Sequence, residues 1–397
     1  MKRFGPIGVA LMILVAACGG GSTTPAGSNT PIVVGFAIAQ SGFAQPFDVP
    51  ASVMAQLGID DLNAKGGLLG HPLKAVFADT QSEISKGANA ALQVMDQGAQ
   101  FVVVTCDFDL GGAAARTAQS KELIVFSPCA ASPKFGVQGI GPWAFTMSNG
   151  VNTQAATLAE WAYKTKAWRN PYILVDSVIG YNVEFGNYFK TSWAKLSGSD
   201  KIAGQDTFLN GDPSIATQIT RLKAISPAPD VIVLSSFPPG GPNALRQIRA
   251  AGITAPVISG PPMDGNYWAG SVPNLTDFYD VSESSVFGDS PDAKINELVN
   301  RYTTKVGNPP ATGDSLTGYA VIQALAAAAQ QANSIDNKAM LNALNHFSKV
   351  PTILGPTSYS STVHYAEGRG MDIMKITNGK DVFVIKVTPA YVPPPAF

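Results

Sequence analysis

The sequence predicts an α/β protein of two similar lobes, each built on a mainly parallel sheet flanked by helices. Two observations carry this prediction. Apolar, β-rich runs alternate with helix-length segments along most of the chain, a pattern typical of parallel strands covered by helices on both faces. The body that follows the first thirty residues is about 365 residues long, which is more than one hydrophobic core usually serves.

The first half of the body opens with the apolar run 31–39, which ends at the polar turn Gln40-Ser41-Gly42 and is expected to be a buried strand. Apolar residues at helical spacing, such as Val53 and Leu57, mark the helix that follows, and Gly66-Gly67 ends it. The same reasoning predicts further strands at 73–78, 101–105 and 123–126 and helices at 49–63, 84–97 and 110–121.

The second half repeats the alternation after a turn-rich crossing near residues 147–150. Strands are expected at 172–175, 231–234 and 257–259, and helices at 153–165, 182–196, 215–225 and 242–251. Ligands of open α/β sheets bind outside the carboxyl ends of the strands. The residues directly after each strand are therefore the first candidates for a site.

The N-terminus indicates export. Lys2 and Arg3 precede an apolar stretch at 4–17, which is too short to span a bilayer comfortably and reads as a secretory signal. The run from Leu14 to Cys18 resembles a bacterial lipobox, so we expect residues 1–17 to be a signal peptide and Cys18 to be lipidated. A buried strand ending in a chance cysteine is the alternative. Residues 18–30 are small, polar and uncharged, as in a flexible tether.

Composition excludes several classes of partner and cofactor. Without Lys2 and Arg3 the chain has 25 basic and 28 acidic residues, a formal charge of −3, and no basic patch that would bind nucleic acid. The three histidines lie far apart in sequence, so no metal site is expected, and no cofactor motif is present. With no second apolar span, the membrane would be reached through the lipid anchor alone.

Two cysteines remain in the body, Cys106 and Cys129. Each follows a strand, and the two strands should be neighbours in one parallel sheet, about 4.8 Å apart. An exported protein lives where disulfides persist. The pair is expected either to form a disulfide or to remain as two small buried thiols.

An ordered set of short segments resembles the leucine/isoleucine/valine-binding proteins, the periplasmic component of ABC importers for branched-chain amino acids, amides, urea and aromatic acids. The similarity extends from about Val33 to Val387. The segments that carry it are Ser41-Gly42, residues 63–67 (NAKGG), residues 244–252 (ALRQIRAAG), residues 317–320 (TGYA) and Gly355-Pro356.

The resemblance implies a type I periplasmic binding fold with a hinge of three crossings, near Ser148, Glu283 and Pro356. Lobe 1 would comprise residues 31–147 and 285–355, and lobe 2 residues 148–284 and 356–390. A hinge of this kind closes around a ligand held between the lobes. The implied protein is a monomeric lipoprotein of the periplasm or cell surface that docks on an ABC permease.

The family holds a ligand carboxylate with hydroxyls and backbone N–H groups of lobe 1, and an ammonium with an acid of lobe 2. Carried over by position, Phe47, Tyr181 and Phe237 would be aromatic walls and Asp264 the acid. The plainer alternatives are core packing for the two phenylalanines, a surface loop for Tyr181 and a turn for Asp264. The ligand-binding residues predicted in this way are Ser41, Phe47, Asp107, Phe108, Asp109, Ala131, Ser132, Tyr181, Phe237 and Asp264.

The carboxylate side departs from the family pattern. Asp107-Phe108-Asp109 stands where a serine is expected, and Ala131 replaces a threonine, although Ser132 is adjacent. An aspartate facing a bound carboxylate would repel it. Either Asp107 or Asp109 caps the helix that begins near Leu110, or the ligand is cationic, polyhydroxylated or lacks a free α-carboxylate.

The predicted function is delivery of a small polar molecule, an amino acid or a related amide, amine or aromatic acid, to an ABC permease. A ligand-sensing receptor module of the same fold is the alternative. An enzyme is disfavoured because the sequence has no G-x-S-x-G elbow, histidine-rich metal set or Walker loop.

Overall fold

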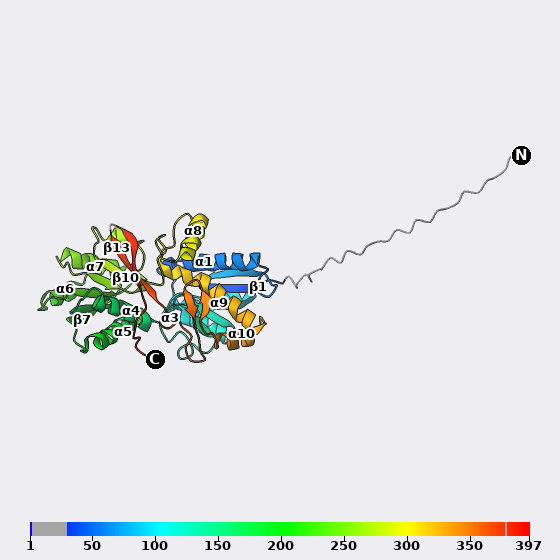
Figure 1. Ribbon diagram of the computed structural model, residues 1–397, viewed down its shortest axis with the longest axis horizontal. Coiled ribbons are helices and arrows are strands. Elements are labelled where there is room, and N and C mark those ends of the chain that lie inside the picture. The colour runs from blue at the N-terminus through cyan, green and yellow to red at the C-terminus, as the bar shows by residue number, and fades with distance from the viewer. Residues whose placement is uncertain (2–29, 378) are drawn as a thin grey trace.

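The computed structural model describes residues 1, 30–377 and 379–397, so the predicted signal peptide, Cys18 and most of the tether lie outside the described residues. Two α/β lobes lie side by side, as predicted (Figure 1). No helix of the described part of the chain is both long and apolar enough to cross a membrane.

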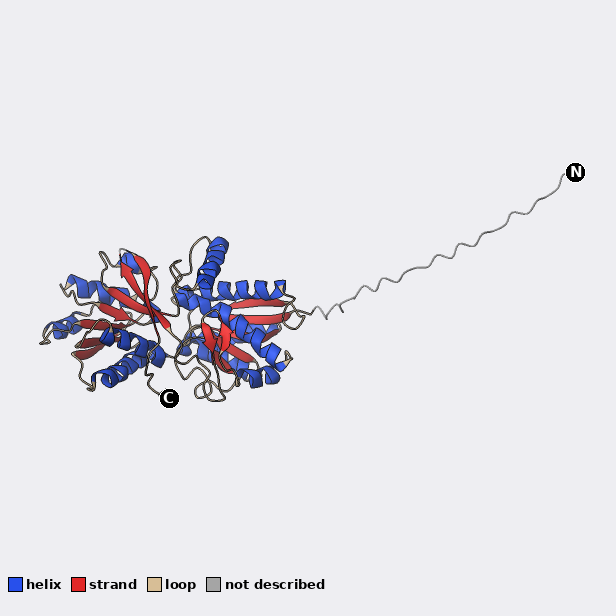
Figure 2. Ribbon diagram, viewed as in Figure 1, coloured by secondary structure: helices blue, strands red, loops and turns tan. Residues whose placement is uncertain are grey.

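Lobe 1 is built on a five-stranded, fully parallel sheet of order β2-β1-β3-β4-β5. Apolar side chains from both faces of the strands make this sheet the centre of the lobe, with helices packed on either side (Figure 2). The strands are β1 (Ile32–Ile38), β2 (Leu73–Asp79), β3 (Ala99–Val104), β4 (Ile124–Ser127) and β5 (Ala144–Thr146).

The helices of lobe 1 form two layers. One layer shares a core with one face of the sheet and consists of α1 (Gln45–Ala64), α8 (Ala293–Val306), α9 (Leu316–Ala332) and α10 (Asn337–Leu344). The opposite face packs on α2 (Ile84–Asp96) and α3 (Phe108–Gln119). A short hairpin of β11 (Val350–Thr352) and β12 (Gly355–Thr357) completes the lobe.

Lobe 2 is built on a seven-stranded mixed sheet of order β14-β13-β10-β9-β8-β6-β7. The first five strands in sequence are parallel: β6 (Pro171–Asp176), β7 (Gly204–Phe208), β8 (Val231–Ser235), β9 (Val257–Ser259) and β10 (Phe278–Ser282). The last two, β13 (Met371–Thr377) and β14 (Lys380–Val387), are antiparallel additions at one edge. The covering helices are α4 (Val151–Lys164), α5 (Gly180–Ser197), α6 (Ala216–Lys223) and α7 (Gly240–Ala250).

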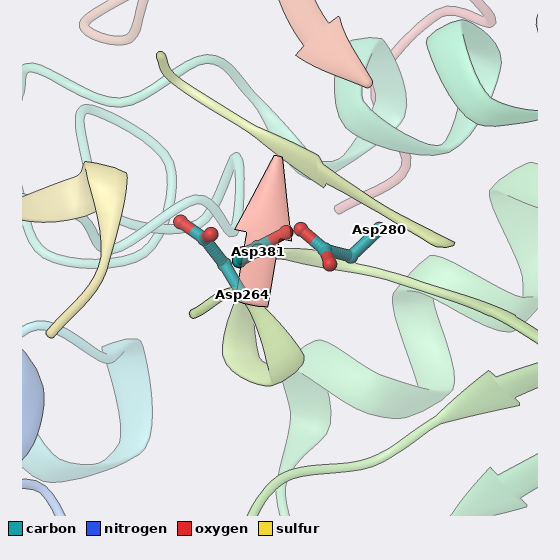
Figure 3. A group of neighbouring side chains, drawn as sticks. All are labelled: Asp264, Asp280 and Asp381. Atoms are coloured by element: carbon teal, nitrogen blue, oxygen red, sulfur yellow. The ribbon is translucent and has the colours of Figure 1, made fainter. Parts of the chain in front are cut away.

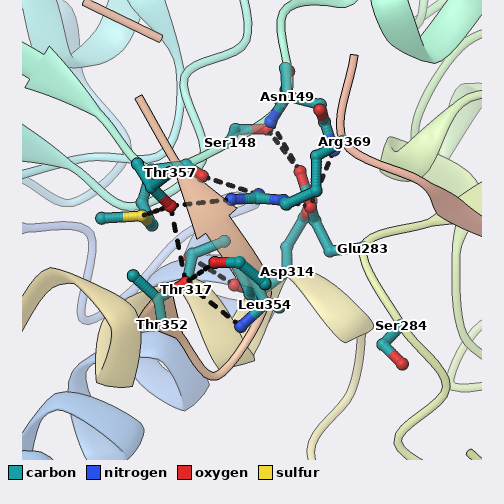
Figure 4. A network of polar contacts seen from close by, with 12 residues as sticks. Ser148, Asn149, Glu283, Ser284, Asp314, Thr317, Thr352, Leu354, Thr357 and Arg369 are labelled. Carbon is teal, nitrogen blue, oxygen red and sulfur yellow. Dashed lines mark hydrogen bonds and ion pairs between the residues drawn. The ribbon is translucent and has the colours of Figure 1, made fainter. Parts of the chain in front are cut away.

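A buried ion pair joins the three segments that cross between the lobes (Figure 4). Glu283 accepts hydrogen bonds from the backbone N–H of Asn149 (2.7 Å) and from the Arg369 guanidinium (2.7 Å). Arg369 also donates to the carbonyl of Met147 (2.9 Å). One carboxylate therefore ties the crossings at 147–150, 282–285 and 366–370 to one another.

The third crossing lies later in the chain than predicted. Gly355-Pro356 forms the β11–β12 hairpin rather than a passage between lobes. Tyr359 then packs against Phe145 and Phe347, with ring centroids 5.3 and 5.9 Å apart, so it belongs to the lobe 1 core. The chain leaves lobe 1 near Arg369, and the boundary predicted at residue 355 was placed too early because Gly-Pro marks any tight turn equally well.

Candidate functional site

A small cavity lies between the lobes, at the carboxyl ends of strands from both sheets. The volume open to the centre of a water molecule is about 60 Å³, room for about four to six waters. This space suits a ligand the size of a small amino acid. It is lined by Phe43, Ala44, Phe47, Cys106, Asp107, Leu110, Cys129, Ala131, Ser132, Gln154, Ile179, Tyr181, Phe237, Pro261, Pro262 and Asp314.

A disulfide forms part of the lobe 1 wall. Cys106 and Cys129 follow the paired strands β3 and β4, which brings their Cα atoms within 4.7 Å, and the two sulfurs are bonded. The prediction of a disulfide is confirmed. Because the bond joins the two loops that carry Asp107 and Ala131, it fixes this side of the cavity.

Asp107 both caps a helix and lines the cavity. It is the N-cap of α3, where its Oδ1 accepts the backbone N–H groups of Asp109 (2.8 Å) and Leu110 (3.0 Å). The capping interpretation is therefore confirmed. Burial raises the pKa of the Asp107 carboxyl to about 7 despite these two hydrogen bonds, because the charged form is taken out of water.

Asp314 is a second acid of the cavity, and sequence reasoning missed it. It lies in the short 3-10 helix η3 (Gly313–Ser315) that leads into α9, and its Oδ1 is buried with no hydrogen-bond partner among the described residues. Burial, and then the nearby charge of Glu283, raise the pKa of Asp314 well above its usual range. No strand precedes this residue, so a search at strand ends could not find it.

The charged side chains of the described cavity lining are all acidic. Among the described residues that line the cavity there are two carboxyl groups, Asp107 and Asp314, and no lysine, arginine or histidine. Buried carboxylates are normally paired with a cation or hydrogen-bonded at every oxygen. The wall therefore presents acceptors that suit a cationic group or a hydrogen-bond donor of a ligand.

Aromatic side chains supply much of the remaining surface, as predicted for Phe47, Tyr181 and Phe237, all three of which line the cavity. The Tyr181 hydroxyl donates to Gln154 (2.6 Å), which holds the ring in place. Phe43 was not predicted. Its ring lies 5.4 Å from that of Phe237, across the cleft, although 42% of Phe43 is exposed.

Ala131 and Ser132 also line the cavity, on the loop that follows β4. Both residues are buried. In the described part of the chain, neither backbone N–H donates to a protein acceptor. These two groups and the Ser132 hydroxyl are therefore available to an acceptor on a ligand.

Four predicted residues do not line this cavity. Ser41 donates its hydroxyl to Asp79 (2.7 Å) at the surface, and Phe108 lies beneath the Arg116 guanidinium, 5.6 Å from its ring centroid. Asp109 accepts the Gly180 N–H (2.8 Å). Their common feature is a partner elsewhere in the protein, which turns each side chain away from the cavity.

Asp264 is the fourth, and its predicted place facing the ligand is corrected. It follows β9 as expected, but its Oδ2 accepts the Ser282 hydroxyl and the Gly313 N–H, both at 2.7 Å. The neighbouring Pro261 and Pro262 line the cavity instead. The 3-10 turn η1 (Pro261–Met263) comes between the strand end and Asp264, whose carboxyl is engaged by Ser282 and Gly313 and does not line the cavity.

The family model described as periplasmic binding protein matches residues 31–381, which is nearly all of the described body. The chain belongs to the periplasmic binding protein family. This assignment agrees with the resemblance found in the sequence and with a solute-binding role.

Known relatives of this periplasmic binding protein share its length and fold. A Leu/Ile/Val-binding protein homolog of Brucella melitensis is 24% identical over 88% of this chain and 93% of its own. The isoleucine complex of the branched-chain amino acid binding protein LivJ from Streptococcus pneumoniae superposes with a TM-score of 0.77 (21% identity, 89% and 99% of the chains). A solute-binding protein of Rhodopseudomonas palustris in complex with benzoate gives 0.75 (16% identity, 92% and 98%).

The two lobes of this periplasmic binding protein contact one another beside the cavity. Three of the contacts are the Asp109–Gly180 hydrogen bond, the Lys134–Glu184 ion pair (2.9 Å) and the Phe43–Phe237 ring contact.

Proposed function

We propose that this protein captures a small solute bearing a protonated amino group, an amino acid or an amine, and delivers it to an ABC permease. The observation that carries the proposal is the cavity between the lobes, whose described lining holds two buried carboxyl groups and no basic side chain. A buried ammonium next to such groups restores the pairing that buried charges require.

The remaining wall favours an amino acid over a simple amine. The ammonium would lie near Asp314 and Asp107, and a ligand carboxylate would face the Ser132 hydroxyl and the N–H groups of Ala131 and Ser132. The aromatic rings around the cavity would cover an apolar side chain. An aromatic acid without an amine would place its only charge in a cavity that already holds two acids, which Coulomb repulsion disfavours.

The test compares three ligands of matched shape: leucine, 3-methylbutylamine, which lacks its carboxylate, and 4-methylpentanoate, which lacks its ammonium. We expect the first two to raise the melting temperature, since a ligand that binds the folded state stabilises it. Titration calorimetry should rank the ligands in the same way, with leucine and 3-methylbutylamine binding more tightly than 4-methylpentanoate. Binding of 4-methylpentanoate without binding of the amine would contradict the proposal. Mass spectrometry of the recovered ligand should show it chemically unchanged.

Export and anchoring form a separate part of the proposal. Leu14-Val15-Ala16-Ala17-Cys18 supports lipidation of Cys18 after cleavage of the signal peptide, with the monomeric body held near the permease by its tether. We expect Cys18→Ser to leave the protein unlipidated and absent from the membrane fraction. Full retention of this variant with membranes would exclude the lipid anchor.

A further inference from the structure

Three aspartates meet inside lobe 2, away from the cavity between the lobes. Asp264 follows η1, Asp280 lies in β10 and Asp381 in β14, and one carboxylate oxygen of each lies within 4.8 Å of the others. None of the three lines the cavity, although Asp264 accepts a hydrogen bond from Gly313, the neighbour of the lining residue Asp314. Figure 3 shows the carboxyl groups of Asp280 and Asp381 directed toward one another, with Asp264 beside them. Asp280 is opposite Met374 and Asp381 opposite Ile376 across β13, so both acids project from the same face of the sheet.

Several carboxylate oxygens of these three acids have no hydrogen-bond partner among the described residues. Asp280 is 0% exposed, and neither of its oxygens has a hydrogen-bond partner in the described part of the chain. The same holds for Oδ1 of Asp264 and Oδ1 of Asp381. Four carboxylate oxygens of this cluster are thus buried without a hydrogen-bond partner among the described residues, whereas buried polar atoms are almost always satisfied.

The surroundings make this arrangement costly. Met263, Phe278 and Ile376 belong to the apolar core of this part of lobe 2. Burial, together with the charge of Asp372, raises the pKa of Asp264 to about 7. Burial and the charges of neighbouring acids, Asp264 among them, raise the pKa of Asp280 and of Asp381 well above the usual range. Two lysines of the strands β13 and β14 pair with other acids, Lys375 with Asp277 and Lys386 with Asp372.

We propose that Asp264, Asp280 and Asp381 form a buried Ca²⁺ site that stabilises lobe 2. All the donors are carboxylate oxygens, the ligands that hard divalent cations prefer. Oxygens up to 4.8 Å apart fit around one Ca²⁺, whose bonds to oxygen are about 2.3–2.6 Å long. Ca²⁺ takes about 6–8 oxygen ligands in flexible geometry, which the carboxylates would supply in part and waters would complete, whereas Mg²⁺ demands near-octahedral geometry with bonds of about 2.0–2.1 Å.

The cation would join three segments that are distant in sequence. The Oδ1 of Asp264 has no hydrogen-bond partner among the described residues, while its Oδ2 accepts the N–H of Gly313, next to Asp314 of the cavity. Binding at the cluster would therefore fix the loop after β9 against β10 and β14. The effect on folding does not depend on the proposed solute and can be measured without one.

The experiment uses the mature protein freed of metal with a chelator and then titrated with CaCl₂ or MgCl₂ in the absence of any solute. We expect Ca²⁺ to raise the melting temperature by several degrees, and equilibrium dialysis to find one Ca²⁺ bound per chain. Because Asp280→Asn keeps the shape and removes a ligand charge, it should weaken Ca²⁺ binding at least tenfold. Asp381→Asn should do the same, which guards against a folding defect confined to one variant.

The matched control is Asp277→Asn, on a half-exposed acid three residues before Asp280 that pairs with Lys375. It should bind Ca²⁺ as the parent does. The proposal is overturned if the parent protein shows no Ca²⁺-dependent stabilisation, which would leave shared protons as the compensation of the acids. It is also overturned if Asp280→Asn and Asp381→Asn keep the full effect, or if Mg²⁺ stabilises as much as Ca²⁺.

Discussion

The hinge and the cavity both bury charged groups, and they differ in whether the protein itself completes them. In the hinge, the carboxylate of Glu283 is paired with Arg369 and accepts two further hydrogen bonds from Asn149, from its backbone N–H and its side-chain amide. In the cavity, Asp107 and Asp314 have no basic partner among the described lining residues. Glu283, whose charge is paired within the protein, ties the three crossings together. Asp107 and Asp314 are the groups that we propose a ligand pairs with.

The largest effect is expected when the Glu283 carboxylate is removed from the buried ion pair with Arg369. Glu283→Ala leaves a buried guanidinium unpaired, and such a loss costs about 3–5 kcal/mol. We expect the free energy of unfolding to fall by that amount in urea titrations. An unchanged stability would show that the three crossings do not depend on this ion pair.

The control for the hinge variant is an ion pair at the surface. Asp60 pairs with Lys305 at 3.1 Å, and both side chains are largely exposed. Exposed pairs contribute about 0–1 kcal/mol, so Asp60→Ala should have little effect. The contrast separates burial from the mere presence of a salt bridge.

In the cavity, removing an acid should affect binding rather than folding. Asp314→Asn removes the proposed partner of a ligand ammonium and leaves that cation unpaired, which costs about 2–5 kcal/mol, or roughly 30-fold or more in affinity. Calorimetry with an amine-bearing ligand measures the loss. Asp336→Asn, at the distant N-cap of α10, is the control and should bind normally. Equal affinity in the two variants would remove Asp314 from the site.

The pH dependence of stability sharpens the comparison through Asp107. Its carboxyl has a folded-state pKa of about 7, against about 3.9 when unfolded. Between these two pH values the folded state holds a proton that the unfolded chain has released. The contribution of the Asp107 carboxyl to stability is therefore greatest in acid, falls as the pH rises and is lost once the pH passes 7. Relative to Asp107→Asn, which keeps the helix cap, the parent should lose about 2–3 kcal/mol between pH 5 and pH 8. Identical pH profiles of unfolding would contradict this.

Much of the fold was predictable because long apolar runs allow few alternatives. β1 and β8 are buried throughout and β3 at every residue but Gln100, and their sequences predict strands without further information. β7 escaped prediction because Gly204–Phe208 has three polar residues in a row and only one apolar side chain, the buried ring of Phe208. The third crossing was misplaced because Gly355-Pro356 indicates a turn but not which lobe the chain enters next.

The site was predictable where it follows a strand, and not elsewhere. Phe47, Tyr181 and Phe237 were found by position, whereas Asp314 lies before a helix and comes to the cavity only through the packing of lobe 1. The direction of a side chain is also beyond a one-dimensional pattern. Asp264 follows its strand as expected, yet the turn before it directs its carboxyl toward Ser282 and Gly313.

The smallest expected effect concerns the mouth of the cleft. Phe43 and Phe237 lie on different lobes, with ring centroids 5.4 Å apart, so their contact exists only in the closed state. An aromatic pair of this kind contributes about 0.5–1.5 kcal/mol beyond its buried area. Because the ligand must overcome the cost of closure, Phe43→Ala should weaken binding about two- to tenfold. Most of the change should be in the dissociation rate. Leu92→Ala, at a comparably exposed apolar residue of α2, should leave binding unchanged. If both variants release the ligand at the parent's rate, the clamp is held shut by the ligand and the hinge, without help from its aromatic rim.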